Sequence, residues 1–220
     1  MRVSEIKKLA RSSLKGNWGS AILLTFITFI VTAILPTIVV TLLSVGFETW
    51  AEDEPIANFV NLVMSLLIIP FSIAIYWFYL ELYRNENPSI GRTFTVYAKG
   101  ELSLRLIGLS ILISIFTSLW SLLLIIPGII KVLAYSQTFY LMKDNPDYGP
   151  LELITESRKR MNGLKWKLFL LYLSFIGWGF LCILTLGIGF LWLVPYITNS
   201  RAAFYQELIY LPNDPKEGDN

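Results

Sequence analysis

Two positively charged side chains lie inside long apolar stretches of this sequence, and they are the first residues that could do chemistry. Lys131 follows the run that ends in Pro127-Gly128, and Arg201 follows Asn199 near the C-terminus. A charge at the centre of a bilayer costs about 2.5–3.5 kcal/mol on insertion scales, so such residues are candidate functional groups. Other interpretations stay open. Lys131 could extend to lipid headgroups, and Arg201 could point inward near the membrane interface or pair with an acid such as Glu81.

Small hydroxyl side chains recur at helical spacing just before Lys131. They are Ser110, Ser114, Ser118 and Ser121. Such a stripe lets two membrane helices approach closely, or it lines a polar pathway. Tyr135 and Gln137, in the next segment, could face the same interior. The candidate polar residues within the membrane are therefore Lys131, Tyr135, Gln137, Ser114, Ser118, Asn199 and Arg201.

A basic cluster lies outside these apolar stretches, at Arg158, Lys159 and Arg160, followed by Lys165 and Lys167. Cations beside a membrane entry contact anionic headgroups and fix the topology. Contact with a cytoplasmic partner is the alternative for the same cluster.

Other chemistry is excluded by composition. The chain has no histidine, which removes Ser-His-Asp and Cys-His catalysis, HExxH zinc sites and histidine proton relays. Its one cysteine, Cys182, cannot form an intramolecular disulfide. A net charge of +2 does not indicate a nucleic-acid binder. We therefore predict no catalytic residues, no cofactor and no metal site.

The elements that would position these residues are long apolar helices. Hydrophobic residues make up 55% of the 220 residues and charged residues only 15%, and the mean hydropathy is +0.59. Apolar runs of about 18 or more residues with few charges are typical of bilayer-spanning helices. We predict membrane segments at about 19–45, 57–82, 104–126, 128–142, 166–184 and 190–209.

Shorter features complete a single integral membrane domain over residues 1–211. Residues 3–15 and 151–162 are predicted to form amphipathic helices on the membrane surface. Pro36 should kink the first segment, and Pro127-Gly128 should form a sharp turn. Residues 212–220 read as a flexible polar tail.

The distribution of charge predicts the orientation. With the N-terminus inside, every Lys and Arg except Lys131 lies on or near the cytoplasmic side. The loop with Glu48, Glu52, Asp53 and Glu54 then falls outside. Both ends of the chain are expected in the cytoplasm. The turns at 127–128 and 185–189 carry no charge, so charge bias does not decide whether the second and third hairpins span fully or end within the bilayer.

Several ordered blocks of sequence resemble one bacterial family. They are 120–131 with Ala134-Tyr135-Ser136, Glu156-Ser157-Arg158 with Met161 and Gly163, 173–178, Pro195-Tyr196 with Ala203-Phe204-Tyr205, and 6–10 with Leu14-Lys15-Gly16. Together they resemble the multi-pass integral membrane family called domain of unknown function 975, over nearly the whole chain. The resemblance implies no activity, but it places Lys131, Ser157 and Arg158 within family motifs. Ser157 therefore joins Arg158, Lys159 and Arg160 as a candidate lipid or partner contact.

These observations predict an all-α membrane protein of about six segments arranged as three helical hairpins with interfacial helices. The expected location is the bacterial cytoplasmic membrane. The expected function is that of a non-enzymatic accessory or scaffold protein that binds anionic lipid, a membrane-protein partner or a second copy of itself, in envelope maintenance or export. The alternative is a small-molecule or ion transporter or channel with a polar pathway between hairpins. A water-accessible cavity lined by Ser114, Gln137, Lys131 or Arg201 would favour transport.

Overall fold

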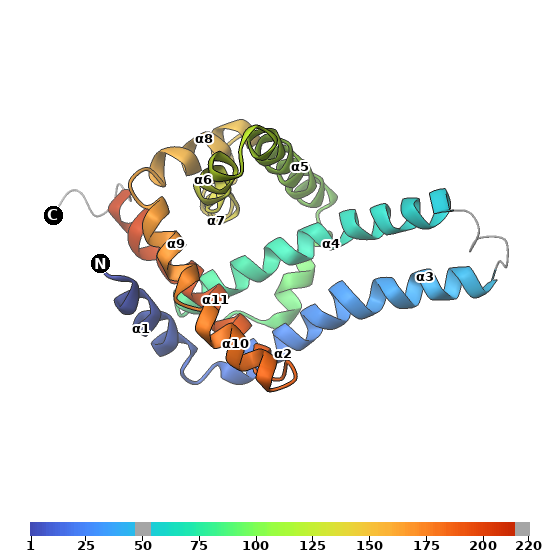
Figure 1. Ribbon diagram of the computed structural model, residues 1–220, viewed down its shortest axis with the longest axis horizontal. Helices are drawn as coiled ribbons and strands as arrows, with labels where there is room; N and C mark the ends of the chain where they lie inside the picture. The colour runs from blue at the N-terminus through green and yellow to red at the C-terminus, as the bar shows by residue number, and fades with distance from the viewer. Residues whose placement is uncertain (47–53, 214–220) are drawn as a thin grey trace.

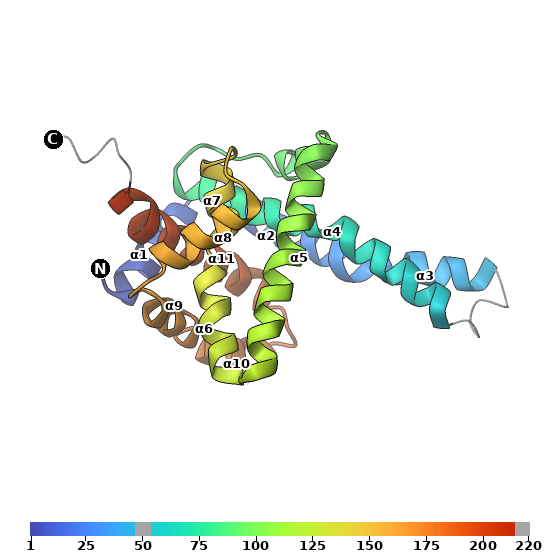
Figure 2. The ribbon, with the colours of Figure 1, turned by 90° about the horizontal axis from the view of Figure 1, so that it is seen from above.

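Every regular element in the described part of the chain is helical, which confirms the all-α part of the predicted fold. The computed structural model describes residues 1–46 and 54–213. The predicted acidic loop and the predicted tail fall almost entirely outside these residues. Figures 1 and 2 show three long helical arms that diverge from a common base, with the two ends of the described chain at that base.

The first arm pairs a broken helix with a long one. α2 (Trp18–Phe29) passes through a π-helical turn (Ile30–Ile34) into α3 (Leu35–Gly46), and α4 (Glu54–Tyr83) forms the other half of the arm. The π-helical turn comes just before Pro36. Proline has no N–H, and its ring clashes with the carbonyl four residues earlier. A widened turn accommodates that clash, so the break lies where the sequence predicted a kink.

The second arm turns earlier than predicted. α5 (Gly100–Leu123) ends at Leu124, whose extended backbone (φ −160°, ψ 144°) leads directly into α6 (Ile125–Tyr135), and α7 (Thr138–Asp144) follows after a short break. Pro127 therefore lies in the first turn of α6 rather than in the turn between helices. The first residues of a helix have no intrahelical partner for their N–H groups, so proline is tolerated there.

Close packing of the second arm depends on Gly128. A Cβ at this position would lie 2.9 Å from the Cα of Ser121 on α5. Small residues let helices in membranes approach this closely. Gly128 therefore allows α5 and α6 to pack closely. Of the serines on α5, Ser121 lies at this helix contact.

We predict that Gly128→Val will lower the Tm of the detergent-solubilised protein by roughly 5 °C, because it overpacks this contact. Gly108→Ala on α5 is the matched control. A Cβ at Gly108 meets nothing within 4 Å, and alanine is the better helix former. Thermal unfolding should therefore leave Gly108→Ala at or above wild type. Equal losses for both variants would contradict the packing role of Gly128.

The third arm runs through α9 (Lys165–Leu173) and α10 (Ile176–Leu184) to its tip and returns through α11 (Phe190–Tyr205). A π-helical turn (Gln206–Tyr210) and a short 3-10 turn (Leu211–Asn213) follow. The tip at 185–189 is uncharged and apolar, and Leu186 there is 94% exposed. An exposed leucine at the end of a hairpin is typical of a surface that contacts lipid.

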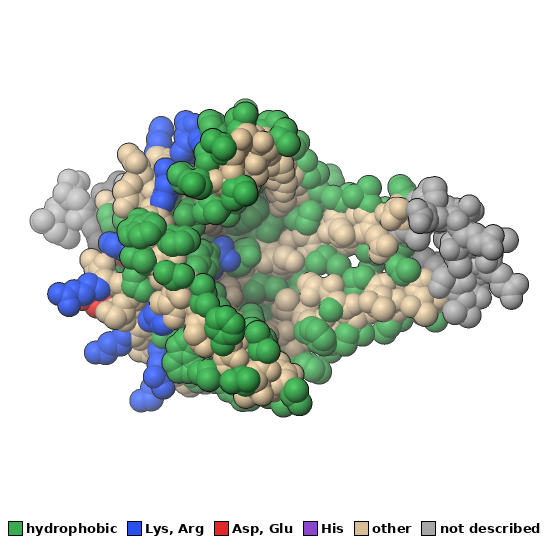
Figure 3. Space-filling view, viewed as in Figure 1, with side chains coloured by type: hydrophobic (Ala, Val, Ile, Leu, Met, Phe, Trp, Pro, Cys, Tyr) green, Lys and Arg blue, Asp and Glu red, His purple; other side chains and the backbone are tan. Residues whose placement is uncertain are grey.

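Two helices at the base, α1 (Val3–Leu14) and α8 (Pro150–Arg160), lie at the positions predicted for amphipathic helices. A 3-10 helix at Ile90–Tyr97, which was not predicted from the sequence, packs against α4 and α5. Figure 3 shows Lys and Arg side chains gathered at this end of the molecule, away from the far end of the first arm.

Within residues 1–46 and 54–213, five helical stretches are long and apolar enough to cross a membrane. They are Trp18–Leu42, Asn58–Tyr83, Gly100–Leu123, Ile125–Asp144 and Lys165–Leu184. The sixth predicted segment is present as α11, but it is not one of these five stretches. It has 16 residues and includes Asn199 and Arg201. The complete six-span arrangement stays a prediction.

A polar network, here called the base clamp, joins α4, α7 and the C-terminal helical turns. Arg84 donates two hydrogen bonds to Asp144, at 2.7 and 2.8 Å, and a third to the Oε1 of Gln206 at 2.8 Å. The Tyr205 hydroxyl donates to the same carboxylate at 2.7 Å. Burial alone would lower the pKa of Arg84, but the hydrogen bonds and charge of Asp144 raise it above the ordinary arginine value. The guanidinium is therefore fixed in its charged form.

Candidate functional site

The main candidate site is an open cavity of about 510 Å³ between the second arm and the helices α4, α9 and α11. Figure 3 shows the molecule hollowed between these groups of helices. The lining residues are Tyr76, Ile113, Ser114, Thr117, Ser118, Val132, Leu133, Tyr135, Ser136, Phe139, Tyr172 and Arg201. Four of the predicted polar residues therefore meet in one place: Ser114, Ser118, Tyr135 and Arg201. We call this space the Arg201 cavity.

Arg201 is held by aromatic rings rather than by an acid. Its guanidinium carbon lies 4.5 Å from the centre of the Tyr76 ring on α4 and 5.9 Å from that of Tyr172 on α9. The Tyr140 ring on α7 lies 5.9 Å from the Tyr76 ring and extends the aromatic layer. A cation over an aromatic face gains about 0.5–2 kcal/mol, which offsets only part of the cost of burying the charge.

No ion pair involves Arg201 among residues 1–46 and 54–213. Its enclosed Nε and the buried Tyr140 hydroxyl have no hydrogen-bond partner in this part of the protein. Glu81, the acid considered for Arg201 from the sequence, pairs with Lys143 at 2.6 Å and with Arg92 at 3.4 Å. The guanidinium donates a hydrogen bond to the Tyr76 hydroxyl but has no acidic partner in the described chain. Because it borders a cavity, its remaining N–H groups offer the chemistry of an anion-binding group.

The opposite wall of the cavity carries hydroxyl groups. Ser114 and Ser118 on α5 are exposed, and Thr117 and Ser136 line the same space. Among these residues, Ser136 donates to the carbonyl of Leu133 at 2.8 Å. The wall can supply hydrogen bonds to an anionic or polar group bound at Arg201, whereas Val132 and Phe139 offer apolar contact.

The structure places Lys131 and Gln137 outside this lining. The Lys131 ammonium lies 4.2 Å from the centre of the Trp120 ring, near the tip of the second arm. Gln137 is fully buried at the break between α6 and α7, where its Nε2 donates to Ser136 at 2.8 Å. The predicted interior therefore gathers only part of the polar set, because Lys131 lies near the arm's tip and Gln137 lies buried at the break between α6 and α7.

Asn199 makes contacts that hold helices together. Its amide donates to the carbonyl of Ala10 and to the Ser13 hydroxyl, both at 2.7 Å, and so it fastens α1 to α11. Ser157 is likewise fully buried and donates to the carbonyl of Ala134 at 2.8 Å, which joins α8 to α6.

The basic cluster on α8 divides in two. Arg158 and Lys159 are exposed and can meet headgroups or a partner. Arg160 is held by Glu156 at 2.7 Å, one helical turn earlier. Pairs four residues apart on one helix contribute only about 0.3–0.5 kcal/mol to stability. Lys159 also lies 3.9 Å from Glu156, so Arg158 is the one residue of the three without an ion pair in the described part of the chain.

The tyrosines around Arg201 were not predicted as part of the site. Tyr76 belongs to an aromatic run that is typical of a headgroup-level belt, and Tyr140 and Tyr172 lie in apolar segments without any motif. Their contact with Arg201 joins helices that are far apart in the chain. The one sequence signal for them was Arg201 itself, because an arginine in an apolar segment needs partner groups around it.

Over residues 1–46 and 54–213, the fold and cavity define the class: an all-helical protein with five stretches suited to crossing a membrane and an arginine without an acidic partner at an open cavity. The chain belongs to the family described as protein of unknown function DUF975, which it matches over residues 1–134 and 122–211. This confirms the resemblance seen in the sequence. No curated protein and no solved structure matches the chain significantly.

Proposed function

We propose that this protein is a non-enzymatic membrane protein that binds an anionic amphiphile in the Arg201 cavity. The observation that carries the proposal is the guanidinium of Arg201, which borders the cavity without an acidic partner in the described chain. An unpaired charge among apolar helices is costly unless a ligand or a water-filled space compensates it. A carboxylate or phosphate headgroup supplies the missing charge and matches the fork of donors on arginine.

The walls of the cavity favour an amphiphile over a small polar anion. Ile113, Val132 and Leu133 lie beside the hydroxyl groups, so one side of a ligand meets apolar surface. α5 and α6 expose many large apolar side chains, which favour contact with acyl chains. A ligand would therefore enter the Arg201 cavity most directly from the acyl-chain region of the bilayer. A fatty-acid carboxylate and a phospholipid phosphate share this chemistry.

Native mass spectrometry of the intact protein tests the proposal with two probes, oleate and dioleoylphosphatidylglycerol. We expect Arg201→Gln to weaken binding of the preferred probe about ten-fold or more, because it removes a charged hydrogen bond worth about 1.5–3 kcal/mol. Arg201→Lys should retain part of the affinity, since it keeps the charge and loses the planar fork.

Arg92→Gln is the matched control for loss of one positive charge. Arg92 is 57% exposed and does not line the cavity, so its replacement should leave binding unchanged. The relative strength of the two probes identifies the headgroup. Equal binding by wild type and Arg201→Gln, for both probes, would overturn the proposal.

Transport remains the second candidate function, and the hydroxyl wall at Ser114, Thr117 and Ser118 favours it. A polar surface facing a cationic group is a feature of anion pathways in membranes. Proteoliposomes loaded with a fluorescent anion indicator distinguish the two. Flux that Arg201→Gln abolishes supports transport, and tight binding without flux supports the accessory function.

We propose the bacterial cytoplasmic membrane as the location, with both ends of the chain in the cytoplasm. The gathering of Lys and Arg at the base, where both described ends lie, supports this orientation. Anionic lipids at that face, a membrane-protein partner and a second copy of the chain are the proposed partners. Labelling of a cysteine placed after Met1, in a Cys182→Ala background, tests the orientation. Reaction with an impermeant reagent in intact cells would contradict it.

A further inference from the structure

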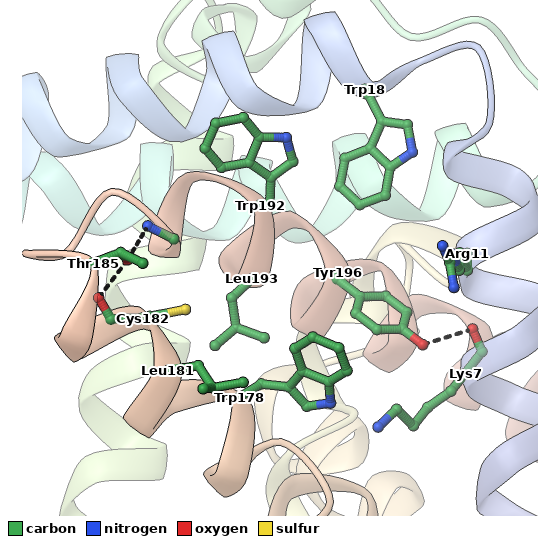
Figure 4. Close-up of a pocket in the computed structure, with 11 residues that line it drawn as sticks. Lys7, Arg11, Trp18, Trp178, Leu181, Cys182, Thr185, Trp192, Leu193 and Tyr196 are labelled. Atoms are coloured by element: carbon green, nitrogen blue, oxygen red, sulfur yellow. Dashed lines mark hydrogen bonds between the residues drawn. The ribbon is translucent and has the colours of Figure 1, made fainter.

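A second cavity, of about 410 Å³, lies between α1, α2 and the α10–α11 hairpin. It shares no lining residue with the Arg201 cavity. Trp18, Trp178 and Trp192 surround it, and Figure 4 shows their indole rings around a trough. Lys7 and Arg11 from α1 stand at one end of this trough, and Thr185 stands at the other. We call this space the tryptophan trough.

The two ends of the trough differ in polarity along the direction of the third arm. Lys7 and Arg11 belong to the basic base of the molecule, whereas Thr185 belongs to the uncharged tip beside the exposed Leu186. Trp178 and Trp192 are 55% and 49% exposed. Indole rings prefer the level between headgroups and acyl chains. The trough therefore runs from a headgroup environment toward an acyl-chain environment.

The cationic end is held in place by contacts within the protein. Lys7 donates to the carbonyl and hydroxyl oxygens of Ser174, at 3.3 and 3.2 Å, and lies 4.1 Å from the centre of the Phe175 ring. Tyr196 donates to the carbonyl of Lys7 at 3.2 Å and so fixes the backbone of α1. Arg11, one turn later on the same helix, is exposed.

The charge at this end is uncompensated. In the part of the chain that the structure describes, no ion pair involves Lys7 or Arg11. Burial lowers the pKa of Lys7 below the ordinary lysine value, which is the direction expected for an ammonium that lacks a carboxylate partner. An anion placed between the two side chains would restore the balance of charge.

We propose that the tryptophan trough binds one anionic phospholipid, with its phosphate at Lys7 and Arg11 and one acyl chain between the tryptophan rings. Positive charge at one end and aromatic, apolar surface along the length match the two parts of such a lipid. The bound lipid bridges α1 to the third arm. The site is independent of Arg201, so either proposal can fail without the other.

Retention of dioleoylphosphatidylglycerol after gentle delipidation, read by native mass spectrometry of the full chain, tests this site. The test variant is Lys7→Gln/Arg11→Gln. The matched control is Lys8→Gln/Lys15→Gln, which removes the same charge from exposed positions at the same end of the chain. We expect the test variant to weaken retention on the order of ten-fold relative to the control, because Lys7 and Arg11 line the trough and would contact the phosphate, whereas Lys8 and Lys15 do not line it.

Brominated acyl chains provide a second measurement, because bromine quenches nearby tryptophan fluorescence. Brominated phosphatidylglycerol should quench wild type and the control variant more strongly than it quenches the test variant. Brominated phosphatidylcholine should show no such difference. Arg201→Gln should behave as wild type, which separates this site from the Arg201 cavity.

Three outcomes overturn the proposal. Equal losses in the test and control variants would mean that the base attracts lipid through its overall charge alone. Equal retention of phosphatidylcholine would remove the role of Lys7 and Arg11. A dimer that forms in place of lipid binding, and that Trp178→Ala disrupts, would assign the trough to a second copy of the chain.

Discussion

Replacing Arg84 with alanine should lower the Tm of the protein by roughly 10 °C, the largest loss of stability that we expect from a single substitution. The Arg84 and Asp144 side chains are only 17% and 10% exposed. Removing one partner of such a pair leaves the other charge buried and uncompensated, which costs about 3 kcal/mol or more. Arg84 also donates to Gln206 and stacks 4.6 Å from the centre of the Tyr210 ring.

The base clamp makes this loss larger than that of a surface pair. Asp144 accepts from both Arg84 and Tyr205, so one carboxylate connects the end of α4 to the end of α11 through α7. Arg84→Lys should recover only part of the stability, because an ammonium cannot form the two parallel hydrogen bonds of the guanidinium.

Arg92→Ala is the control for this prediction. Arg92 is 57% exposed and meets Glu81 at 3.4 Å, so its removal should cost at most about 1 kcal/mol. Thermal unfolding in one detergent, with the wild type alongside, compares the variants. If Arg84→Ala and Arg92→Ala unfold at the same temperature, the base clamp does not hold the helices together.

The sequence was sufficient for features that depend on neighbouring residues. The apolar runs defined the long helices because their length and composition suit only a bilayer or a deep core. Pro36 marked the break in the first arm, since the clash of a proline ring is local. The turn predicted at Pro127-Gly128 was placed too late in the chain, because proline fits equally well in the first turn of a helix.

The candidate site was only partly predictable for the same physical reason. Ser114 and Ser118 share a face with period 3.6, and that face does border the Arg201 cavity. Gln137 was placed there too, but the break between α6 and α7 changes the direction of the side chains that follow it. No pattern within one segment reports such a break.

Contacts between distant segments could not be predicted at all. Asn199 reaches α1 across 189 residues of sequence, and Arg84 reaches Asp144 across 60. A single sequence does not indicate which helix faces which. An asparagine or arginine in an apolar segment indicates that a partner exists, but the fold alone selects that partner.

Arg201→Met should act in the opposite direction to Arg84→Ala and raise the Tm, by roughly 3 °C. Methionine keeps apolar volume against the rings of Tyr76 and Tyr172, and it removes a charge that has no acidic partner in the described chain. The lost cation–π contacts, at about 0.5–2 kcal/mol, are smaller than the cost of holding that charge among apolar helices. A net gain of about 1 kcal/mol follows.

The Tm should be measured on ligand-free protein in detergent, because a bound anion would stabilise the wild type but not Arg201→Met. Arg160→Met is the control of opposite sign. Arg160 is 16% exposed and is held by Glu156 at 2.7 Å, so its loss should lower the Tm slightly. A variant that is more stable and yet no longer binds the anionic probe marks a residue kept for function at a cost in stability. If Arg201→Met unfolds as early as Arg84→Ala, Arg201 is a structural group whose aromatic contacts satisfy it, and the cavity has no need of an anion.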